Sequence, residues 1–247
     1  MKKIFAYVGS PKGSDSYTWK LTKLVLEQAA LFGAGEIEYK LFSADQKKIN
    51  FCCGCCSCFN KGFCPFDTAD AMGALKDEML QSDLIILSSP VYAHNVTGNM
   101  KVFLDRISYW MHLFRLTGKL GITISSSDSN GNEQVNGYLN KLMQLYGLHV
   151  ICNFMAVKIN NPLTPDNNFL NLNVSALSEL IYDYLIHNKP IKATKTQEAL
   201  FQHMKSYLLE LETANIQNPE YTYWKEHKYL ECDSYSDLLT KVGHIKL

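Results

Sequence analysis

Short apolar runs alternate with longer amphipathic segments over the first 157 residues of this 247-residue chain, and this alternation restricts its fold. The runs have the length of strands, and the segments between them carry apolar residues at helical spacing. Five strands are predicted, at Ile4–Val8, Ile37–Phe42, Asp83–Ser88, Leu120–Ser125 and Val150–Val157. Helices are predicted between them, at Tyr17–Phe32, Ala69–Leu80, Asn99–Phe114 and Val135–Tyr146.

The alternation of strands and helices implies parallel strands joined by right-handed crossovers. The third strand, Asp83–Ser88, is almost continuously apolar, as a strand buried on both faces must be. We therefore predict an α/β fold, in which a doubly wound parallel sheet has five strands in the order 2-1-3-4-5.

The pattern changes after about residue 158. A turn-rich connector, Asn160–Asn168, is followed by predicted helices at Val174–His187 and Thr196–Thr213 and a short one near Tyr235–Lys241. We predict one domain over residues 1–157, with a cysteine-rich loop at 51–66. Residues 158–247 form a helical C-terminal extension, packed on the same domain or on a partner subunit.

The charge of the chain excludes some partners. It has 24 Lys and Arg against 24 Asp and Glu, so it lacks the basic excess that nucleic acids and anionic membranes attract. Its apolar stretches are shorter than the roughly 18–20 residues of a membrane span, and the first one is too short for a signal peptide. We predict a cytoplasmic protein with no nucleic-acid or membrane partner.

The segment Gly9–Thr18, between the first strand and the first helix, is rich in hydroxyl groups. At this place in the fold, backbone N–H groups and the helix dipole favour a bound anion. The hydroxyls of Ser10, Ser16 and Thr18 are candidate donors to phosphate oxygens, and Lys12 supplies a charge. The segment has neither the dinucleotide nor the P-loop glycine pattern, so a terminal phosphomonoester suits it better. Alternatively, Ser16 or Thr18 only caps the helix.

A second polar loop, Ser88–Asn99, follows the third strand. In the predicted order the ligand crevice lies between the ends of strands one and three, so these two loops converge on one ligand. Pro90 stiffens the turn, and the ring of Tyr92 suits a flat ligand. Backbone groups around Val91 and Asn95 are candidate partners for a ring edge. The alternative for Tyr92 is half-buried packing.

The loop after the fourth strand, Ser125–Gly131, opens at the same edge of the sheet. It adds Ser126, Ser127 and Asp128 to the candidate binding residues.

Six of the eight cysteines lie between Cys52 and Cys64, a concentration that favours a metal or redox site over a disulfide scaffold. Four of them have the spacing CxxCxxCx5C, and thiolates this close on one loop are suited to an iron–sulfur cluster. Four thiolates also suit zinc, and free or redox-active thiols are the third alternative. The four are Cys52, Cys55, Cys58 and Cys64, whereas Cys53 and Cys56 fall outside the spacing.

Three strings of residues resemble the NAD(P)H-dependent FMN reductase family of the flavodoxin-like fold. They are Gly9-Ser10-Pro11-Lys12 with Ser16-Tyr17-Thr18, then Ser89-Pro90-Val91-Tyr92 with Asn95, and Lys101-Val102-Phe103-Leu104-Asp105-Arg106. The resemblance covers roughly residues 1–157. It implies FMN bound non-covalently by three loops, in a homodimer or homotetramer. The implied binding residues are Ser10, Lys12, Ser16, Tyr17, Thr18, Pro90, Val91, Tyr92, Asn95, Ser126, Ser127 and Asp128.

The same comparison bears on individual residues. Lys12 stands where the family often has arginine, which replaces a forked donor by a point charge. We expect Asp105 and Arg106 to form a structural ion pair on the third helix. The cysteine spacing resembles the iron–sulfur flavoprotein branch of the family, which implies a [4Fe–4S] cluster on Cys52, Cys55, Cys58 and Cys64.

The resemblance implies an FMN-dependent oxidoreductase. Electrons would pass from NAD(P)H or reduced ferredoxin through FMN, and through the cluster, to a small acceptor such as a quinone, flavin or nitro compound. One alternative is a flavodoxin-like electron carrier without a substrate of its own. Another is a zinc or thiol redox protein that uses the cysteine loop.

Overall fold

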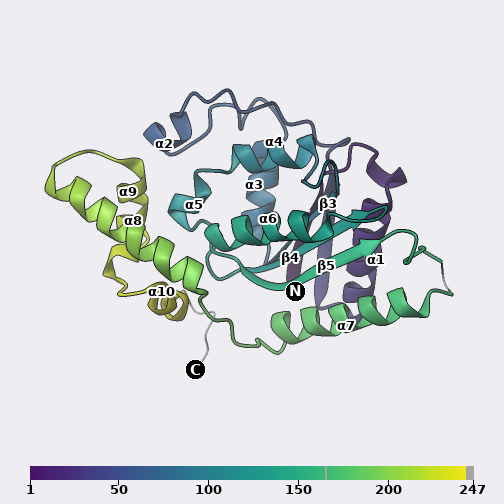
Figure 1. Cartoon of the computed structure of the whole chain (residues 1–247). Helices are drawn as coiled ribbons and strands as arrows, with labels where there is room; N and C mark the ends of the chain where they lie inside the picture. The colour runs from purple at the N-terminus through teal and green to yellow at the C-terminus, as the bar shows by residue number, and fades with distance from the viewer. Residues whose placement is uncertain (165, 243–247) are drawn as a thin grey trace.

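The structure is a computed structural model that describes residues 1–164 and 166–242. Pro165 of the predicted connector and the last five residues of the extension lie outside the described residues. Five strands form one parallel sheet in the order β2-β1-β3-β4-β5, which confirms the predicted fold class and order (Figure 1). The strands are β1 (Lys2–Val8), β2 (Ile37–Ser43), β3 (Leu84–Pro90), β4 (Leu120–Ser127) and β5 (His149–Val157).

The register of the strands gathers their carboxyl ends at one edge of the sheet. Val8 at the end of β1 lies opposite Ser43 of β2 and Ser88 of β3, and Ser126 of β4 lies opposite Pro90. Loops that leave these strands therefore open side by side, as expected of a ligand crevice in a doubly wound sheet.

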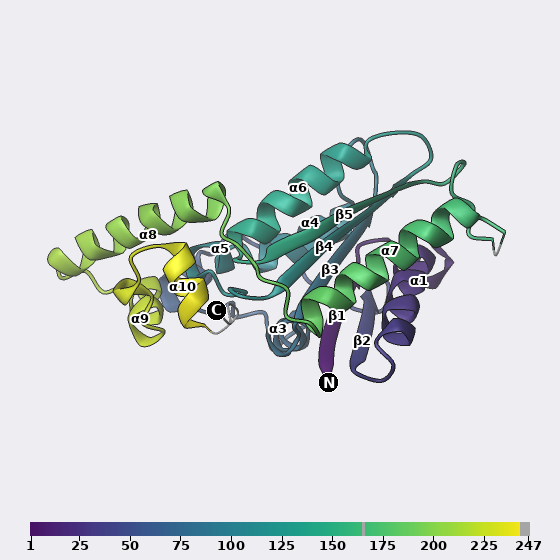
Figure 2. The ribbon, with the colours of Figure 1, turned by 90° about the horizontal axis from the view of Figure 1, so that it is seen from below.

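Helices cover both faces of the sheet. α1 and α7 lie on one face, and α3, α4 and α6 pack on the other (Figure 2). The helices are α1 (Tyr17–Phe32), α2 (Ser57–Lys61), α3 (Met72–Gln81), α4 (Gly98–Arg106), α5 (Trp110–Leu113), α6 (Asn132–Leu145), α7 (Asn168–Leu185), α8 (Lys195–Thr213), α9 (Pro219–Glu226) and α10 (Tyr235–Lys241).

The predicted single helix Asn99–Phe114 is two helices, which corrects that expectation. α4 ends at Arg106, and a turn over residues 107–109 leads into α5, whose C-cap residue Phe114 has a φ of 44°. The break lets the side chains of Ile107, Trp110 and Phe114 all reach apolar partners, and each is buried. Tertiary packing therefore overrides helical continuity here, and the aromatic side chains of this segment belong to the core.

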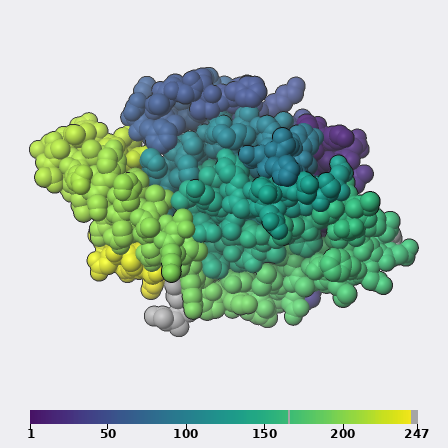
Figure 3. Space-filling model, in the orientation of Figure 1, coloured from purple at the N-terminus to yellow at the C-terminus, as the bar shows by residue number. Residues whose placement is uncertain are grey.

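The extension packs through an aromatic cluster at one end of the sheet. Trp224 of α9 is fully buried, with its ring stacked on Phe201 of α8 at 4.9 Å and its Nε1 donating to the carbonyl of His112 at 2.8 Å. Tyr235 of α10 donates to the carbonyl of Gly147 at 2.7 Å. Together α8, α9 and α10 form a lobe beside the sheet, visible at the left of Figure 3.

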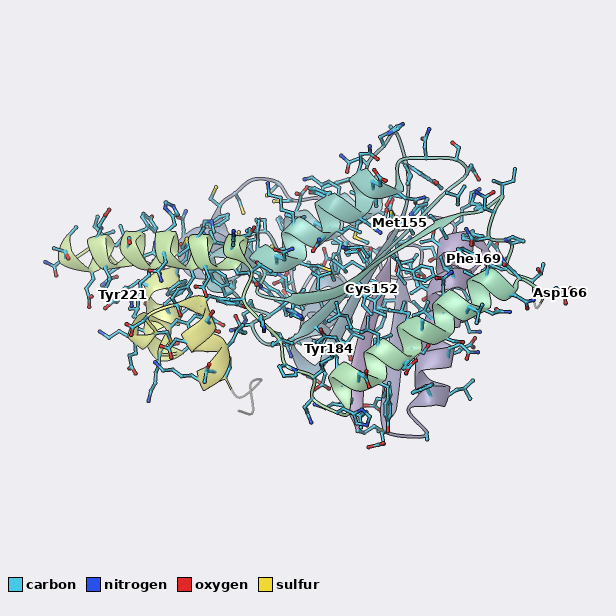
Figure 4. The ribbon with its side chains drawn as sticks, turned by 60° about the horizontal axis from the view of Figure 1, so that its bottom comes forward. Cys152, Met155, Asp166, Phe169, Tyr184 and Tyr221 are labelled. Carbon is cyan, nitrogen blue, oxygen red and sulfur yellow. The ribbon has the colours of Figure 1, made fainter. Side chains whose placement is uncertain are left out.

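The edge strand β5 and the neighbouring helix α7 carry several exposed apolar side chains. Figure 4 shows Cys152 and Met155 on β5, with Phe169 and Tyr184 near the two ends of α7 and Tyr221 in the lobe. Phe169 is 68% exposed and Met155 is 49% exposed. No described helix is long and apolar enough to cross a membrane.

Candidate functional site

Gly9, directly after β1, brings the first loop into contact with α4. Its N–H donates to the carbonyl of Ser88 at 2.8 Å, and its carbonyl accepts from the hydroxyl of Thr97 at 2.6 Å. A Cβ at this position would lie 2.6 Å from Cβ of Met100. The absence of a side chain at Gly9 therefore permits the close approach of the loops after β1 and β3.

The next residues form a tight turn at the amino end of α1. The hydroxyl of Ser16 caps the helix by accepting from the N–H of Trp19 at 3.0 Å, and Ser10 accepts from the N–H of Lys12 at 3.3 Å. Both hydroxyls keep their own proton available to donate. Among the described residues, the N–H groups of Tyr17 and Thr18 at the start of α1 make no hydrogen bond. The loop therefore offers several donors and the positive helix end to an anion.

Two of the predicted binding side chains are engaged elsewhere. The hydroxyl of Thr18 is buried and hydrogen-bonded to the hydroxyl of Ser126 at 2.6 Å, which ties α1 to β4 beneath the loop. Tyr17 donates its hydroxyl to the carbonyl of Asn161 at 2.5 Å, and its partial burial raises its pKa to about 12. These side chains hold the loop in place rather than lining its open side.

The charged residues of the site lie near its mouth. Asp128 is exposed and pairs with Lys158 at 2.7 Å, and a hydrogen bond with that ammonium lowers the pKa of the carboxyl group, with a smaller effect from the charge of Lys12. Lys12 and Lys158 are thus the cations near the helix end, with the carboxylate of Asp128 paired to Lys158 and the carboxylate of Asp45 lying against Gly13 of the same loop.

The loop after β3 contains a two-residue turn that the sequence did not reveal. The backbones of Tyr92 and Asn95 exchange two hydrogen bonds of 2.9 Å, and Ala93 and His94 between them have φ of 48° and 59°. This left-handed geometry is unusual for residues other than glycine and stores strain where a ligand would bind. No local pattern of the kind Asn-Gly announces such a turn, so the sequence did not indicate a role for the backbone of Ala93 and His94.

The turn also changes which groups can contact a ring. The N–H of Val91 is already bonded to the carbonyl of Ser126 at 2.8 Å, and the N–H groups of Tyr92 and Asn95 bond within the turn. Within the described chain, the N–H groups of Ala93 and His94 have no partner. The free donors at this side of the crevice are therefore at the tip of the turn, while the 46%-exposed ring of Tyr92 stands beside them.

Ser126 and Ser127 lie in β4, not in the loop after it. Both are buried, and Ser127 accepts from the amide of Asn132 at 2.8 Å. The strand is longer than predicted because its last residue, Ser127, pairs with Val157 of β5. Asn132 keeps a buried Oδ1 without a partner among the described atoms, and it lines a cavity of about 470 Å³ with His94 and Met155.

The cysteine-rich loop leaves the same edge of the sheet after β2. In Figure 3 this blue segment runs along the upper surface, toward the C-terminal lobe. All six thiols are free: Cys52, Cys53, Cys55 and Cys56 are exposed, and Cys58 and Cys64 are half-buried. A hydrogen bond with Ser57 lowers the pKa of the Cys55 thiol, and burial raises that of Cys58.

The base of this loop is held by buried ion pairs. The side chain of Arg106 has no exposed surface and contacts Asp70 at 2.5 Å and Asp67 at 3.1 Å, and Lys76 contacts Asp67 at 2.7 Å. This corrects the expected pair between Asp105 and Arg106, because Asp105 bonds Lys101 one turn earlier on α4. The sequence indicated a partner for Arg106 on its own helix. In the fold its partners are Asp67 and Asp70, which follow the cysteine-rich loop in sequence.

Within the described residues, no group of three metal-ligating side chains forms a metal site, and this includes the four thiols of the CxxCxxCx5C spacing. The donor chemistry nevertheless fits an iron–sulfur cluster, since four thiols stand on one short, largely exposed loop whose ends are fixed.

Comparison with known proteins agrees with this arrangement. Residues 2–161 match the family described as NADPH-dependent FMN reductase. The chain belongs to this family. An iron-sulfur flavoprotein of Archaeoglobus fulgidus is 35% identical over 147 residues, which are 59% of this chain and 64% of that protein, so the match spans less than two thirds of that relative. Iron-sulfur flavoprotein MJ1083 of Methanocaldococcus jannaschii is 28% identical, over 65% of this chain and 78% of its own.

A solved structure supports the fold alone. The apo form of an NADH:FMN oxidoreductase superposes with a TM-score of 0.54 at 18% identity, over 80% of this chain and 94% of that chain. The sheet that carries the three loops thus has the flavodoxin-like fold, and the helices α7, α8, α9 and α10 lie beyond the residues of the family match.

Proposed function

We propose that this protein is an FMN-dependent oxidoreductase that takes electrons from NAD(P)H or reduced ferredoxin and delivers them to a small acceptor such as a quinone, flavin or nitro compound. The observation that carries this proposal is the first loop, where unpaired N–H groups of Tyr17 and Thr18 meet the free hydroxyl protons of Ser10 and Ser16 beside Lys12. This donor set matches the terminal phosphate of FMN.

The second loop would hold the flavin ring. The N–H groups of Ala93 and His94 are the available donors for its polar edge, and the exposed ring of Tyr92 can pack along it. When bound, FMN would accept a hydride from a nicotinamide and release electrons to an acceptor, so the protein needs no acid–base pair of its own. The residues of this chain bind the phosphate, orient the ring and cover its edge.

We also propose that Cys52, Cys55, Cys58 and Cys64 hold a [4Fe–4S] cluster. The iron-sulfur flavoproteins to which the chain is similar and the thiol-rich loop on this surface support this assignment. When bound, a cluster would exchange single electrons. Homodimer or homotetramer formation would suit the exposed apolar side chains on β5 and α7, including Met155 and Phe169.

The phosphate site is tested by comparing FMN with riboflavin, which lacks the phosphate. Loss of one charged phosphate contact costs about 1.5–3 kcal/mol, so Lys12→Ala should weaken FMN binding by about tenfold or more, with riboflavin binding unchanged. Lys20→Ala, an exposed lysine on α1, is the matched control and should bind FMN like the wild type. Equal affinity of the wild-type protein for FMN and riboflavin would exclude this phosphate site.

Turnover separates the enzyme from a flavodoxin-like carrier. The FMN-loaded protein should oxidise NADH or NADPH in the presence of menadione, free FMN or nitrofurazone. A protein that is reduced once and does not turn over with any of the three is a carrier.

The cluster is tested by anaerobic purification with iron, sulfide and zinc assays. We expect about four iron and four sulfide per chain, lost in Cys58→Ser and retained in Cys53→Ser, because Cys53 lies outside the ligand spacing. Stoichiometric zinc without sulfide would favour the zinc alternative, and neither metal would leave a thiol protein.

A further inference from the structure

A cavity of about 520 Å³ lies between α2 of the cysteine-rich loop and the C-terminal lobe. Phe59 and Asn60 of α2 line one side of it, residues of α8 and α9 line the other, and His112 of α5 lies between them. None of the three loops of the flavin crevice contributes to its lining. Figure 1 shows α2 at the left, near α5 and the lobe, whereas α1 and the loop before it lie at the right. The cavity is therefore separate from the proposed FMN site.

A histidine and a buried carboxylate meet in this cavity. Oε1 of Glu220 lies 2.8 Å from Nδ1 of His112, and the side chain of Glu220 is only 7% exposed, whereas that of His112 is 40% exposed. Since a carboxylate oxygen accepts, Nδ1 carries the hydrogen of this bond. Within the described chain Nε2 of His112 has no partner, so it is the ring nitrogen left for a ligand.

Both members of this pair are fixed by their surroundings. Glu220 stands in the first turn of α9, where Asn218 caps the helix by accepting from its N–H at 2.7 Å. The carbonyl of His112 accepts from Nε1 of the buried Trp224 at 2.8 Å. The ring of Phe59 lies against the imidazole, with the ring centres 5.4 Å apart. The imidazole is thus held in place before any ligand arrives.

The lining of the cavity restricts the chemistry of a ligand. No described lysine or arginine lines it, and Glu220 adds a negative charge, so phosphate-bearing molecules such as FMN and NAD(P)H lack a cationic partner there. Its volume is typical of a small-molecule site. The apolar part of its surface comes from Phe59, Leu200 and Met204. An uncharged aromatic molecule with a hydrogen-bonding oxygen fits these properties.

The exposed nitrogen of His112 suits a quinone in both of its oxidation states. An imidazolium donates from Nε2–H to a quinone carbonyl, and Nε2 of a neutral imidazole accepts from a hydroquinone hydroxyl. A single histidine held at Nδ1 can therefore contact substrate and product in turn.

We propose that this cavity binds the quinone acceptor, with the ring against Phe59 and one oxygen hydrogen-bonded to Nε2 of His112. The role of this ligand as acceptor rests on the proposed function. In that function the quinone becomes a hydroquinone by gaining the two electrons and one proton of a hydride from NAD(P)H and one proton from the solvent. The acceptor would then bind beside the cysteine-rich loop, and the electron donor would bind at the flavin.

The site is tested by isothermal titration calorimetry of the full chain, free of flavin, with 2,3-dimethyl-1,4-naphthoquinone. Its substituted ring positions do not add thiols. His112→Gln places an amide beside Glu220 and removes Nε2, so the affinity should fall by about fivefold to tenfold, as expected for one lost hydrogen bond. His227→Gln makes the same change at an exposed histidine of the lobe, outside the lining of this cavity, and should leave the affinity unchanged.

A second pair of variants tests the space itself. Leu200→Trp puts a larger side chain into the lining, so the affinity should fall by at least about tenfold. Leu209→Trp makes the same change on α8 at a 40%-exposed leucine outside the lining, and the affinity should stay at the wild-type value. If Leu200→Trp does not fold by circular dichroism, Leu200→Phe takes its place.

The results can overturn the site without reference to turnover. A wild-type protein that does not bind the quinone, or equal affinities in all variants, would reject the cavity as the site. Binding that appears only after FMN is added would place the quinone on the flavin ring and would also reject it.

Turnover of the FMN-loaded protein separates this inference from the proposed function. His112→Gln should raise the KM for the quinone and leave the KM for NAD(P)H unchanged. A wild-type protein that binds the quinone in this cavity but does not oxidise NAD(P)H would refute the proposed function and leave the binding site in place.

Discussion

Substitution of Gly9 by alanine tests the geometry at the centre of the site. The new Cβ would lie 2.6 Å from Cβ of Met100 and 2.9 Å from the hydroxyl of Thr97. Two carbon atoms in contact stay about 3.5–4.0 Å apart, so α4 would have to withdraw by about 1 Å. That movement would stretch the 2.6 Å hydrogen bond from Thr97 to the carbonyl of Gly9.

Overpacking of this kind costs about 1–3 kcal/mol. For a chain of this size, 2 kcal/mol corresponds to a fall in Tm of about 4–8 °C. We therefore expect Gly9→Ala to unfold at lower urea concentration than the wild type and to bind FMN more weakly, because the loop that follows Gly9 carries the phosphate donors.

Gly137→Ala provides the matched control. Gly137 lies on the exposed side of α6 with open space where a Cβ would stand, so alanine should stabilise the helix by about 0.5–1 kcal/mol. Urea denaturation of the two apo variants, each compared with the wild type, measures both effects. If Gly9→Ala is within 0.5 kcal/mol of the wild type and binds FMN with unchanged affinity, the loops do not approach as closely as the structure shows.

Three further predictions concern other parts of the molecule. Trp224→Ala should lower the free energy of unfolding by about 3–5 kcal/mol, whereas Tyr207→Ala, at a 41%-exposed position of α8, should cost less than about 1 kcal/mol by urea denaturation. Thr18→Val and Ser126→Ala should show a coupling energy of about 1 kcal/mol in a double-mutant cycle, since each hydroxyl loses its partner in either variant. Burial alone would raise the pKa of Asp70, but its bonds from Arg106, Asn50 and Met72 lower it, so this carboxylate stabilises the fold above the unfolded pKa of about 4 and the contribution is lost as pH falls below that value. The unfolding free energy of Asp70→Asn should therefore fall less than that of the wild type between pH 5 and pH 3, and parallel curves would contradict this assignment.

The sequence predicted the sheet well because its central strands, β1, β3 and β4, are buried on both faces. The continuous apolar run Leu84–Leu87 is typical of a strand buried on both faces. The order of the strands follows from right-handed crossovers between them. α1 agrees at both ends with the predicted Tyr17–Phe32, since Ser16 supplies a local N-cap signal. Features encoded by local sequence were therefore recovered.

The candidate site was predicted by position rather than by side-chain role. Spacing placed Thr18 and Ser126 near the crevice, but their hydroxyls bond each other in the interior, which depends on how α1 packs on β4. The donors at Ala93 and His94 depend on a turn with left-handed residues that their types do not favour. The partners of Arg106 lie 36 and 39 residues away in sequence, so no local pattern could name them.

Helix α4 connects the two proposed centres mechanically. At its amino end, the hydroxyl of Thr97 donates to the carbonyl of Gly9 in the first loop. In its middle, the ring of Phe103 stacks on the ring of Tyr7 of β1, with the ring centres 4.3 Å apart. Its carboxyl end carries Arg106. A helix of nine residues behaves as a rigid rod about 13 Å long. Displacement of the whole rod by Gly9→Ala should therefore disturb the flavin loop and the cysteine-rich loop together. Arg106→Lys leaves the rod in place and removes contacts only at its far end, so it should alter the cysteine-rich loop while FMN affinity stays unchanged. This asymmetry distinguishes a shared scaffold from two independent sites.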